Sequence, residues 1–379
     1  MMRNPSQSAL GAWSGGRFIH FGEEIEEQRL VELLRPGNGI DTVITADAYG
    51  AGAADEIVCQ ALGGVAREDY CLVGAVGHDF YEGERRGAKG FQRFTDAELR
   101  GPDQYASYLR MATERSLERC GVDHFDLLLL HNPDRIGYTS EVVWKAMAQL
   151  REEGLAGKIG VAPGPANGFT LDIIDCFERF GEMIDWAMVI LNPFEPWPSR
   201  LVLPAAERYD VSLIARVVDY GGIFHGDVAP GHDFPETDHR RYRPGDWVES
   251  GSAKLDQLRP IAERHGLTPL QLACQWTLAQ PMVRCVAPTL IQEGGEGARA
   301  IEEKRAELAA LPSEIVLTDE EIAEINAVGE NAGCMTLKGA APDYEGDPVA
   351  DQWPLDEQLL KLAARWEIDP EAQLRLLNA

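Results

Sequence analysis

The stretch Phe125-Asp126-Leu127-Leu128-Leu129-Leu130-His131-Asn132-Pro133-Asp134 decides how the rest of the chain is interpreted. Its run of four leucines is too short for a buried helix or a membrane span, and it ends abruptly in polar residues and proline. Such a run is typical of a central parallel strand that is covered on both faces. His131 then lies at the carboxyl end of the strand, where the active site of an α/β barrel is built.

Strand and helix patterns alternate along the chain on both sides of this stretch. The sequence predicts eight strands, at residues 17–22, 41–46, 70–76, 125–131, 158–162, 186–191, 211–217 and 283–287. This alternation predicts an α/β fold, a closed eight-stranded parallel β/α barrel of the TIM type with right-handed crossovers. We expect residues 1–328 to form the barrel. Residues 329–379 are too few to bury a core of their own, and we expect them to form a C-terminal tail that packs on the barrel.

Composition excludes several classes of partner. A net charge of −27 over 379 residues argues against nucleic acid and anionic membranes, which bind clustered Lys and Arg. No apolar run of about 18 residues occurs, so no membrane span is expected. The seven cysteines are scattered, without a C-x-x-C pair, which favours free thiols in a reducing cytoplasm. We expect a cytoplasmic protein with a small-molecule substrate, and a homo-oligomer is compatible with the sequence.

Several stretches resemble the aldo/keto reductase superfamily. Residues 39–50 resemble its second-strand signature G-I-N-x-x-D-T-A-x-x-Y-G, and residues 116–131 resemble S-L-x-R-L-G-x-D-Y-x-D-L-x-x-x-H. Residues 158–161 and 271–276 resemble its fifth strand and a late helix, so the matches span roughly residues 17–328. The resemblance implies the same barrel with a C-terminal extension.

The resemblance also implies a catalytic set of Tyr, His, Asp and Lys, which this chain matches only in part. Tyr49 matches the Tyr that donates a proton to the carbonyl, and His131 matches the His. Ile44 stands at the Asp position and Ala75 at the Lys position. A phenol has a pKa near ~10, and a desolvated phenol without a neighbouring cation has a higher one. Tyr49 alone is therefore expected to be a weak acid.

The nicotinamide site that the resemblance implies is altered as well. Leu191 occupies the position of the Gln that binds the carboxamide in the family, and Arg216 occupies that of the Tyr on which the nicotinamide ring stacks. Asp219 lies in the segment that contacts the phosphates in the family. After the eighth strand, the segment that contacts the adenosine phosphate in the family reads Pro288-Thr289-Leu290-Ile291-Gln292-Glu293-Gly294-Gly295-Glu296-Gly297. A carboxylate beside a pyrophosphate repels it. These departures argue against hydride transfer.

The predicted strand ends offer a ring of polar side chains instead. Tyr49 and His131 are the expected catalytic pair, with Tyr49 as acid and His131 as base. The expected substrate-binding residues are His20, His78, Asn192, Glu195, Arg216, Asp219, Tyr220 and His225. Each of them also has a purely structural interpretation: Arg216, for example, is equally suited to a salt bridge with Asp219 or Glu195. The histidines show no local ligand pair, so no metal is expected.

Three hypotheses follow. The leading one is an aldo/keto-reductase-like barrel that performs acid/base chemistry, as a lyase, dehydratase or isomerase, on a small oxygenated, carbonyl- or sugar-like metabolite, with no cofactor. The alternative is a divergent NADP(H)-dependent oxidoreductase in which Arg216 or Lys89 replaces the lost lysine. The third is a non-catalytic barrel subunit, since a barrel can keep its fold after losing its site.

Overall fold

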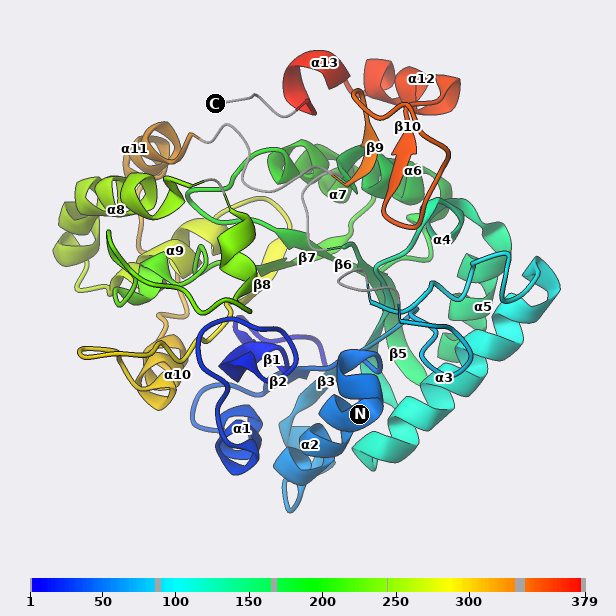
Figure 1. Cartoon of the computed structure of the whole chain (residues 1–379), viewed down its shortest axis with the longest axis horizontal. Helices are drawn as coiled ribbons and strands as arrows, with labels where there is room; N and C mark the ends of the chain where they lie inside the picture. The colour runs from blue at the N-terminus through cyan, green and yellow to red at the C-terminus, as the bar shows by residue number, and fades with distance from the viewer. Residues whose placement is uncertain (1, 86–89, 165–168, 244, 331–337, 376–379) are drawn as a thin grey trace.

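The computed structural model of the chain describes residues 2–85, 90–164, 169–243, 245–330 and 338–375. Eight strands form one parallel sheet in the order β1 to β8, so that each strand pairs with the next one along the chain. The sheet closes on itself because Ser8 bridges Val286 in parallel, and the Val286 N–H donates to the Gln7 carbonyl at 2.9 Å. The expected eight-stranded β/α barrel is confirmed (Figure 1).

The strands are short and sit in the middle of the molecule. They are β1 (Ala9–Gly11), β2 (Thr42–Ile44), β3 (Cys71–Val76), β4 (Phe125–His131), β5 (Ala156–Ala162), β6 (Trp186–Ile190), β7 (Ser212–Arg216) and β8 (Val283–Ala287). The bounds of β4 and β8 are those that the sequence predicts, and the ends of the other strands from β2 to β7 differ from the predicted ones by at most two residues.

The first strand lies earlier in the chain than the sequence predicts. β1 pairs Ala9 with Thr42, whereas residues 17–22 belong to the loop that follows it. Gly16 and Gly22 flank that loop segment with φ angles of +77° and +65°, which bend the backbone out of an extended course. Phe18 and Ile19 pack onto the core from this loop, and the expectation of a strand at residues 17–22 was wrong.

Helices surround the barrel. They are α1 (Glu27–Leu34), α2 (Ala53–Leu62), α3 (Tyr105–Cys120), α4 (Arg135–Thr139), α5 (Glu141–Glu152), α6 (Thr170–Phe180), α7 (Leu203–Arg208), α8 (Trp247–Arg264), α9 (Pro269–Leu278), α10 (Ile301–Ala309) and α11 (Asp319–Gly329). Local chemistry sets their ends: the Thr268 hydroxyl accepts from the Gln271 N–H at the start of α9, and Gly121 ends α3 with a φ of +69°. The sequence pattern did not predict α10.

The leucine run of β4 is buried on both faces, as its pattern predicts. Leu127 and Leu129 point into the barrel, where they pack in a core of inward-facing side chains that includes Ile44 and Ala75. Leu128 and Leu130 belong to the larger core between the strands and the helices. All four leucines are fully buried. The interior of the barrel is therefore a packed apolar floor beneath the strand ends.

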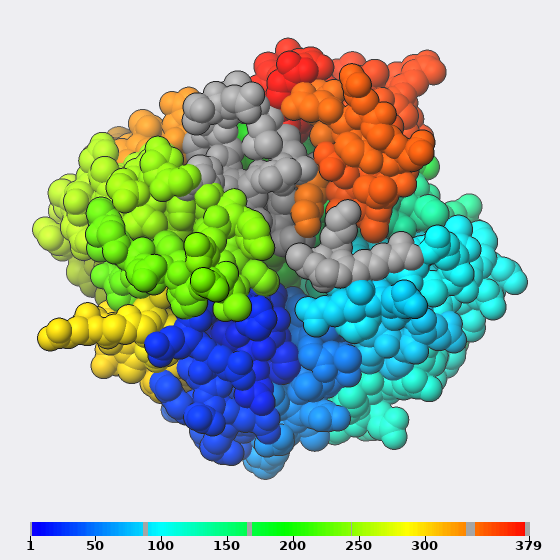
Figure 2. All heavy atoms as spheres, in the orientation of Figure 1, coloured from blue at the N-terminus to red at the C-terminus, as the bar shows by residue number. Residues whose placement is uncertain are grey.

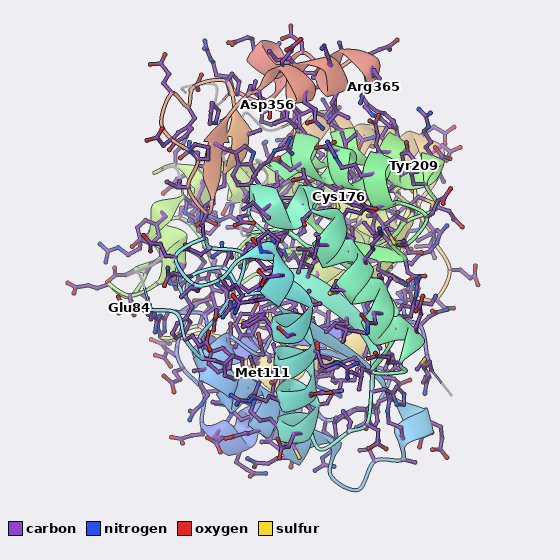
Figure 3. All side chains as sticks on the ribbon, turned by 90° about the vertical axis from the view of Figure 1, so that its right-hand side faces the viewer. Glu84, Met111, Cys176, Tyr209, Asp356 and Arg365 are labelled. Atoms are coloured by element: carbon purple, nitrogen blue, oxygen red, sulfur yellow. The ribbon has the colours of Figure 1, made fainter. Side chains whose placement is uncertain are left out.

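The C-terminal tail contacts the barrel through a small parallel sheet of β9 (Gly339–Ala341) and β10 (Gln352–Pro354), followed by α12 (Glu357–Arg365) and α13 (Pro370–Gln373). Asp172 of α6 accepts hydrogen bonds from the Ala340 N–H at 3.2 Å and the Trp353 indole N–H at 3.0 Å. Figure 3 shows α12, with Asp356 and Arg365 labelled, above the helix that carries Cys176. The division into a barrel of residues 1–328 and a tail of residues 329–379 stays a prediction.

Within the described part of the chain, no helix combines the length and the apolar character needed to cross a membrane.

Candidate active site

Tyr49 lies at the carboxyl end of the barrel, at the start of the short helix η2 (Tyr49–Gly52) that follows β2. Its half-buried ring packs against the apolar core inside the barrel, above Ile44 and Ala75. The Tyr49 ring meets the ring of His131, at the end of β4, edge to face with the centroids 5.6 Å apart. The structure thus brings together the two residues expected to be catalytic.

The pKa of Tyr49 follows from this apolar setting. Burial raises the pKa of the Tyr49 phenol to about 12, and the positive charge of Arg216 acts in the opposite direction. Arg216 ends β7 and points toward the same mouth, where its guanidinium donates to the carbonyl oxygens of Pro163 at 3.1 Å and Gly164 at 2.6 Å. The cation that faces Tyr49 therefore comes from β7, whereas Ala75 of β3 supplies none.

Arg216 has no carboxylate partner among the described residues. The anticipated salt bridge with Asp219 or Glu195 is not formed, because Glu195 pairs with Arg243 at 2.9 Å and Asp219 accepts from backbone N–H groups. Burial lowers the pKa of Arg216, while Tyr49 raises it. A guanidinium stays charged at any pH a protein experiences, so Arg216 holds a positive charge near the phenol.

His131 is neutral at physiological pH. Burial, with Arg93 and Arg216 nearby, lowers the pKa of His131 to about 3. Its Nδ1 atom is buried and has no hydrogen-bond partner among the described residues. An imidazole with such a pKa is a poor general base near neutral pH, but it can orient an oxygen through a hydrogen bond. This electrostatic setting argues against the proton abstraction expected of His131.

His78 lies next to His131, with the ring centroids 5.1 Å apart. Its two nitrogens are already engaged: Nδ1 lies 3.0 Å from the Phe91 carbonyl, and Nε2 lies 3.0 Å from the side-chain nitrogen of Asn132. Burial, then Arg93, lower the pKa of His78. His78 is thus placed to support the mouth, and the substrate role predicted for it stays a prediction.

Arg93 connects three parts of the mouth that the sequence alone did not link. It comes from the long loop after β3, and its guanidinium donates to the Asn132 carbonyl and contacts His78 Nδ1 at 3.2 Å. It also forms a buried ion pair with Asp351 of the tail at 2.5 Å. Neither Arg93 nor Asp351 lies in a recognisable sequence motif, so the sequence gives no sign that they form a pair. Figure 2 looks onto this end of the barrel, with the cyan segment after β3 and the orange tail on the same, right-hand side of the view.

The remaining residues of the predicted substrate set lie in polar and aromatic contacts within the protein. Asn192 donates to Glu195 at 2.7 Å and to the Val217 carbonyl at 2.9 Å, and its own oxygen accepts from the Phe194 and Glu195 N–H groups. These contacts hold the loops after β6, β7 and β8 together. Glu195, which accepts from Asn192, forms an ion pair with Arg243. Asp219 and His225 both form hydrogen bonds with the backbone of Thr289, and the ring of Tyr220 packs against that of Trp247.

Two sequence expectations change with this geometry. His20 is not at a strand end: it is exposed in the loop after β1, with its ring 5.7 Å from that of His239. Asp219 is fully buried, and burial raises its pKa to about 6. Because its carboxylate accepts from the Thr289 N–H at 2.7 Å, it anchors the loop after β8. A substrate role for His20, Asn192, Glu195, Asp219, Tyr220 or His225 stays a prediction. Lys89 lies outside the described residues.

A cavity of about 690 Å³ opens at the same end of the barrel, within the size range of ligand pockets. It lies among the loops after β1, β7 and β8, and is lined by Gly22, Glu23, His232, Asp233, Phe234, Pro235, Glu236, Arg241, Glu293, Gly294 and Gly295. Ligands of α/β folds bind at the carboxyl ends of the strands, and glycine backbone allows close approach. Within the described residues, no group of three or more His, Cys, Asp or Glu side chains could hold a metal ion.

Comparison with known proteins now gives the family. The family model described as Aldo/keto reductase family matches residues 9–330. The chain belongs to the aldo/keto reductase family. It is 26% identical over 360 residues to Aldo-keto reductase YhdN of Bacillus subtilis (strain 168), which covers 92% of this chain and 96% of that protein.

Two solved structures of aldo/keto reductase type share the fold. The glycerol dehydrogenase AKR11B4 from Gluconobacter oxydans superposes with a TM-score of 0.67 at 22% identity, covering 86% of this chain and 92% of that one. An aldo/keto reductase from Klebsiella pneumoniae, solved in complex with NADP and acetate, superposes with a TM-score of 0.56 at 23% identity, covering 85% and 90%.

These findings correct two of the expectations. The leading hypothesis of a non-redox lyase, dehydratase or isomerase was wrong, because the family and the similar proteins are reductases and a dehydrogenase. The expectation of no cofactor was wrong as well, since the Klebsiella aldo/keto reductase was solved with NADP. The argument from the missing lysine was incomplete, because the positive charge of Arg216 on β7 acts on Tyr49 although the lysine position is Ala75.

Proposed function

We propose that this aldo/keto reductase family member is an oxidoreductase that uses a nicotinamide dinucleotide to reduce the carbonyl group of a small oxygenated metabolite, or to oxidise the corresponding alcohol. The observation that carries the proposal is the placement of Tyr49 at the barrel mouth against His131, with the charge of Arg216 acting on the phenol. A proton donor, an orienting imidazole and a cation are the parts that carbonyl reduction requires of the protein.

The residues present fit a dinucleotide in part. The cavity of about 690 Å³ lies at the carboxyl ends of β1, β7 and β8, and the loop after β1 joins it to the apolar core on which Tyr49 packs. Gly22, Gly294 and Gly295 would let backbone approach a pyrophosphate. A reduced nicotinamide, when bound, supplies the hydride that is added to the carbonyl carbon.

Each residue of the mouth then has one task. The Tyr49 hydroxyl gives its proton to the carbonyl oxygen as that oxygen gains negative charge. The neutral His131 holds the oxygen by a hydrogen bond, and Arg216 stabilises the negative charge left on the phenolate. The apolar floor formed by Ile44, Ala75 and Leu129 excludes water from beneath the reacting groups.

The proposal is tested by measuring binding and turnover separately. NADH and NADPH are titrated into the purified full chain while tryptophan fluorescence is followed, and turnover is measured by nucleotide absorbance with a panel of small aldehydes, ketones and sugars. We expect the Tyr49→Phe variant to bind nucleotide like the wild type and to lose most of its turnover. Failure of both nucleotides to bind, or turnover that is unchanged in Tyr49→Phe, would contradict the proposal.

We also keep the cytoplasm as the proposed compartment. The six cysteines among the described residues, which include Cys71 and Cys285, are free thiols, and this supports a reducing environment. Self-association stays a prediction that sedimentation of the purified chain would test.

A further inference from the structure

We infer that the cavity among the loops after β1, β7 and β8 accepts the adenosine half of a dinucleotide whose ribose carries a free 2′-hydroxyl, so that the protein selects NAD(H) over NADP(H). This inference rests on the proposed function. Membership of the family does not decide between the two nucleotides; the side chains that line the cavity in this chain decide it.

The cavity is within reach of the barrel mouth. Ile19 packs on the core inside the barrel beside Tyr49, and Gly22 and Glu23 line the cavity three and four residues later in the same loop. Three residues of extended chain span at most about 11 Å, so a single elongated ligand can lie along this loop from the mouth to the cavity. The backbone holds the loop in place, since the Gly22 N–H donates to Asp238 at 2.8 Å and the Glu23 N–H to the Gln292 carbonyl at 2.7 Å.

The charged side chains of the lining are mostly acidic. Glu23, Asp233 and Glu236 are exposed and form no ion pair among the described residues, and the buried Glu293 is the fourth carboxylate. Against these four stand the guanidinium of Arg241 and the imidazole of His232, whose Nε2 already lies 3.3 Å from Glu293. The cavity wall therefore carries a net negative charge.

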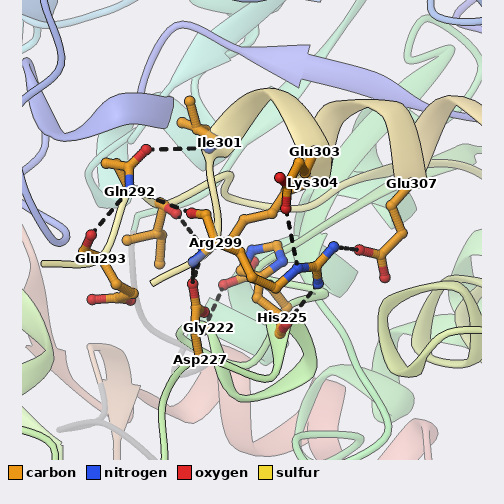
Figure 4. A network of polar contacts seen from close by, with 12 residues as sticks. Gly222, His225, Asp227, Gln292, Glu293, Arg299, Ile301, Glu303, Lys304 and Glu307 are labelled. Carbon is orange, nitrogen blue, oxygen red and sulfur yellow. Dashed lines mark hydrogen bonds and ion pairs between the residues drawn. The ribbon is translucent and has the colours of Figure 1, made fainter. Parts of the chain in front are cut away.

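The nearby cations are engaged with other groups. Arg240 is fully buried between Asp238 at 2.7 Å and Glu293 at 2.5 Å. After β8, Arg299 pairs with Glu307 at 2.7 Å and Lys304 pairs with Asp227 at 2.6 Å, and Lys304 also donates to the Ile291 carbonyl. Figure 4 shows Arg299 and Lys304 directed to these carboxylates and to backbone oxygens within one polar network.

The chemistry of the ligand decides between the two nucleotides. A phosphate monoester at the 2′ position carries about −1.5 to −2 charge at neutral pH, and carboxylates without free cations repel it. A ribose with a free 2′-hydroxyl instead donates hydrogen bonds to carboxylates, the arrangement by which acidic residues select NAD in dinucleotide sites. Since Glu293 is already paired with Arg240, three exposed carboxylates remain, and Arg241 alone does not offset them.

The test is the ratio of the dissociation constants of NADPH and NADH, measured by fluorescence titration of the full chain without substrate. We expect NADH to bind at least about tenfold more tightly at low salt, and the ratio to fall as ionic strength rises, because salt screens the repulsion of exposed charges. The double variant Asp233→Lys/Glu236→Lys should bind NADPH at least about tenfold more tightly than the wild type does.

A matched control separates local charge from net charge. The double variant Glu320→Lys/Glu324→Lys makes the same change in net charge on exposed residues of α11, which does not line the cavity, and it should leave the ratio nearly unchanged. NADPH binding as tightly as NADH in the wild type, or an equal response of the two double variants, overturns this inference alone. Binding of neither nucleotide overturns it together with the proposed function.

Discussion

The rings of Tyr49 and His131 meet at 90° with their centroids 5.6 Å apart, and both residues lie in the field of Arg216. The phenol is held protonated, with a pKa raised to about 12 by burial, while the imidazole is held neutral, with a pKa lowered to about 3. The mouth therefore presents one weak acid and one uncharged hydrogen-bonding ring over an apolar floor.

Removing the charge of Arg216 should slow the proposed reduction. Arg216→Met keeps much of the side-chain volume but removes the cation that lowers the pKa of Tyr49, and we expect kcat to fall about 100-fold. Arg216→Lys retains the charge and should keep more of the activity. The measurement is steady-state turnover, with Arg200→Met, an exposed arginine of a neighbouring loop, as the matched control. Equal turnover of Arg216→Met and the wild type would remove Arg216 from the mechanism.

The two directions of the reaction should depend differently on pH. Reduction uses the protonated Tyr49, which predominates below its pKa of about 12, so its rate should stay flat between about pH 6 and pH 9. Oxidation uses the phenolate, and its rate should rise about tenfold per pH unit over the same range. His131 adds no inflection there because its pKa is about 3. An inflection near pH 6.5 that disappears in His131→Ala would contradict this assignment.

Breaking the contact between the tail and the loop after β3 should destabilise the protein. Asp351→Asn leaves the buried Arg93 without its ion-pair partner, and we expect the free energy of unfolding to fall by about 3 kcal/mol, the size typical of an unpaired buried charge. Urea denaturation measures the change, and Asp347→Asn, an exposed residue of the same tail, is the control. Similar losses in the two variants would show that Arg93 does not depend on Asp351.

Asp172 should make the stability depend on pH. Burial raises the pKa of its carboxyl to about 7, above that of an unfolded Asp near ~3.9. The folded state thus binds the proton more tightly, so its contribution to stability is complete at acid pH and is lost as pH rises from about 4 through 7. We expect the wild type to lose up to about 4 kcal/mol more than Asp172→Asn over this range, measured by urea denaturation at each pH. Parallel curves for the two proteins would contradict the raised pKa.

The fold could be predicted from the sequence where burial leaves a pattern. The four leucines of β4 form a short apolar run that is typical of a doubly covered strand, and residues 283–287 are apolar apart from the exposed Arg284. Both strands were placed correctly. β1 could not be found in this way, because Ala9–Gly11 has three residues and is fixed by pairing with Thr42 and by barrel closure at Val286. α10 was missed because Ile301–Ala309 is rich in charged residues and buries only a narrow stripe.

The candidate site was predictable only as far as its motifs reach. Tyr49 and His131 follow from the resemblance, and the structure brings them together. The contact of Arg93 with Asp351 joins residues 258 positions apart, and no local pattern announces such a pair. The replacement of the polar Asp and Lys positions by Ile44 and Ala75 was visible in the sequence. Arg216 was one of two candidates for the replacing cation, because the sequence alone does not show which strand end faces the phenol.

In an eight-stranded barrel, β3 and β7 stand on opposite walls, four strands apart in either direction. The charge that acts on Tyr49 therefore comes from the wall opposite the lysine position. The side chain of Ala75 on β3 is apolar, and the guanidinium of Arg216 belongs to β7. Changes to β7 and to the loop carbonyls that hold Arg216 are thus the means by which mutation or engineering would tune the acidity of this phenol, while the wall beside Ala75 remains free to vary in shape.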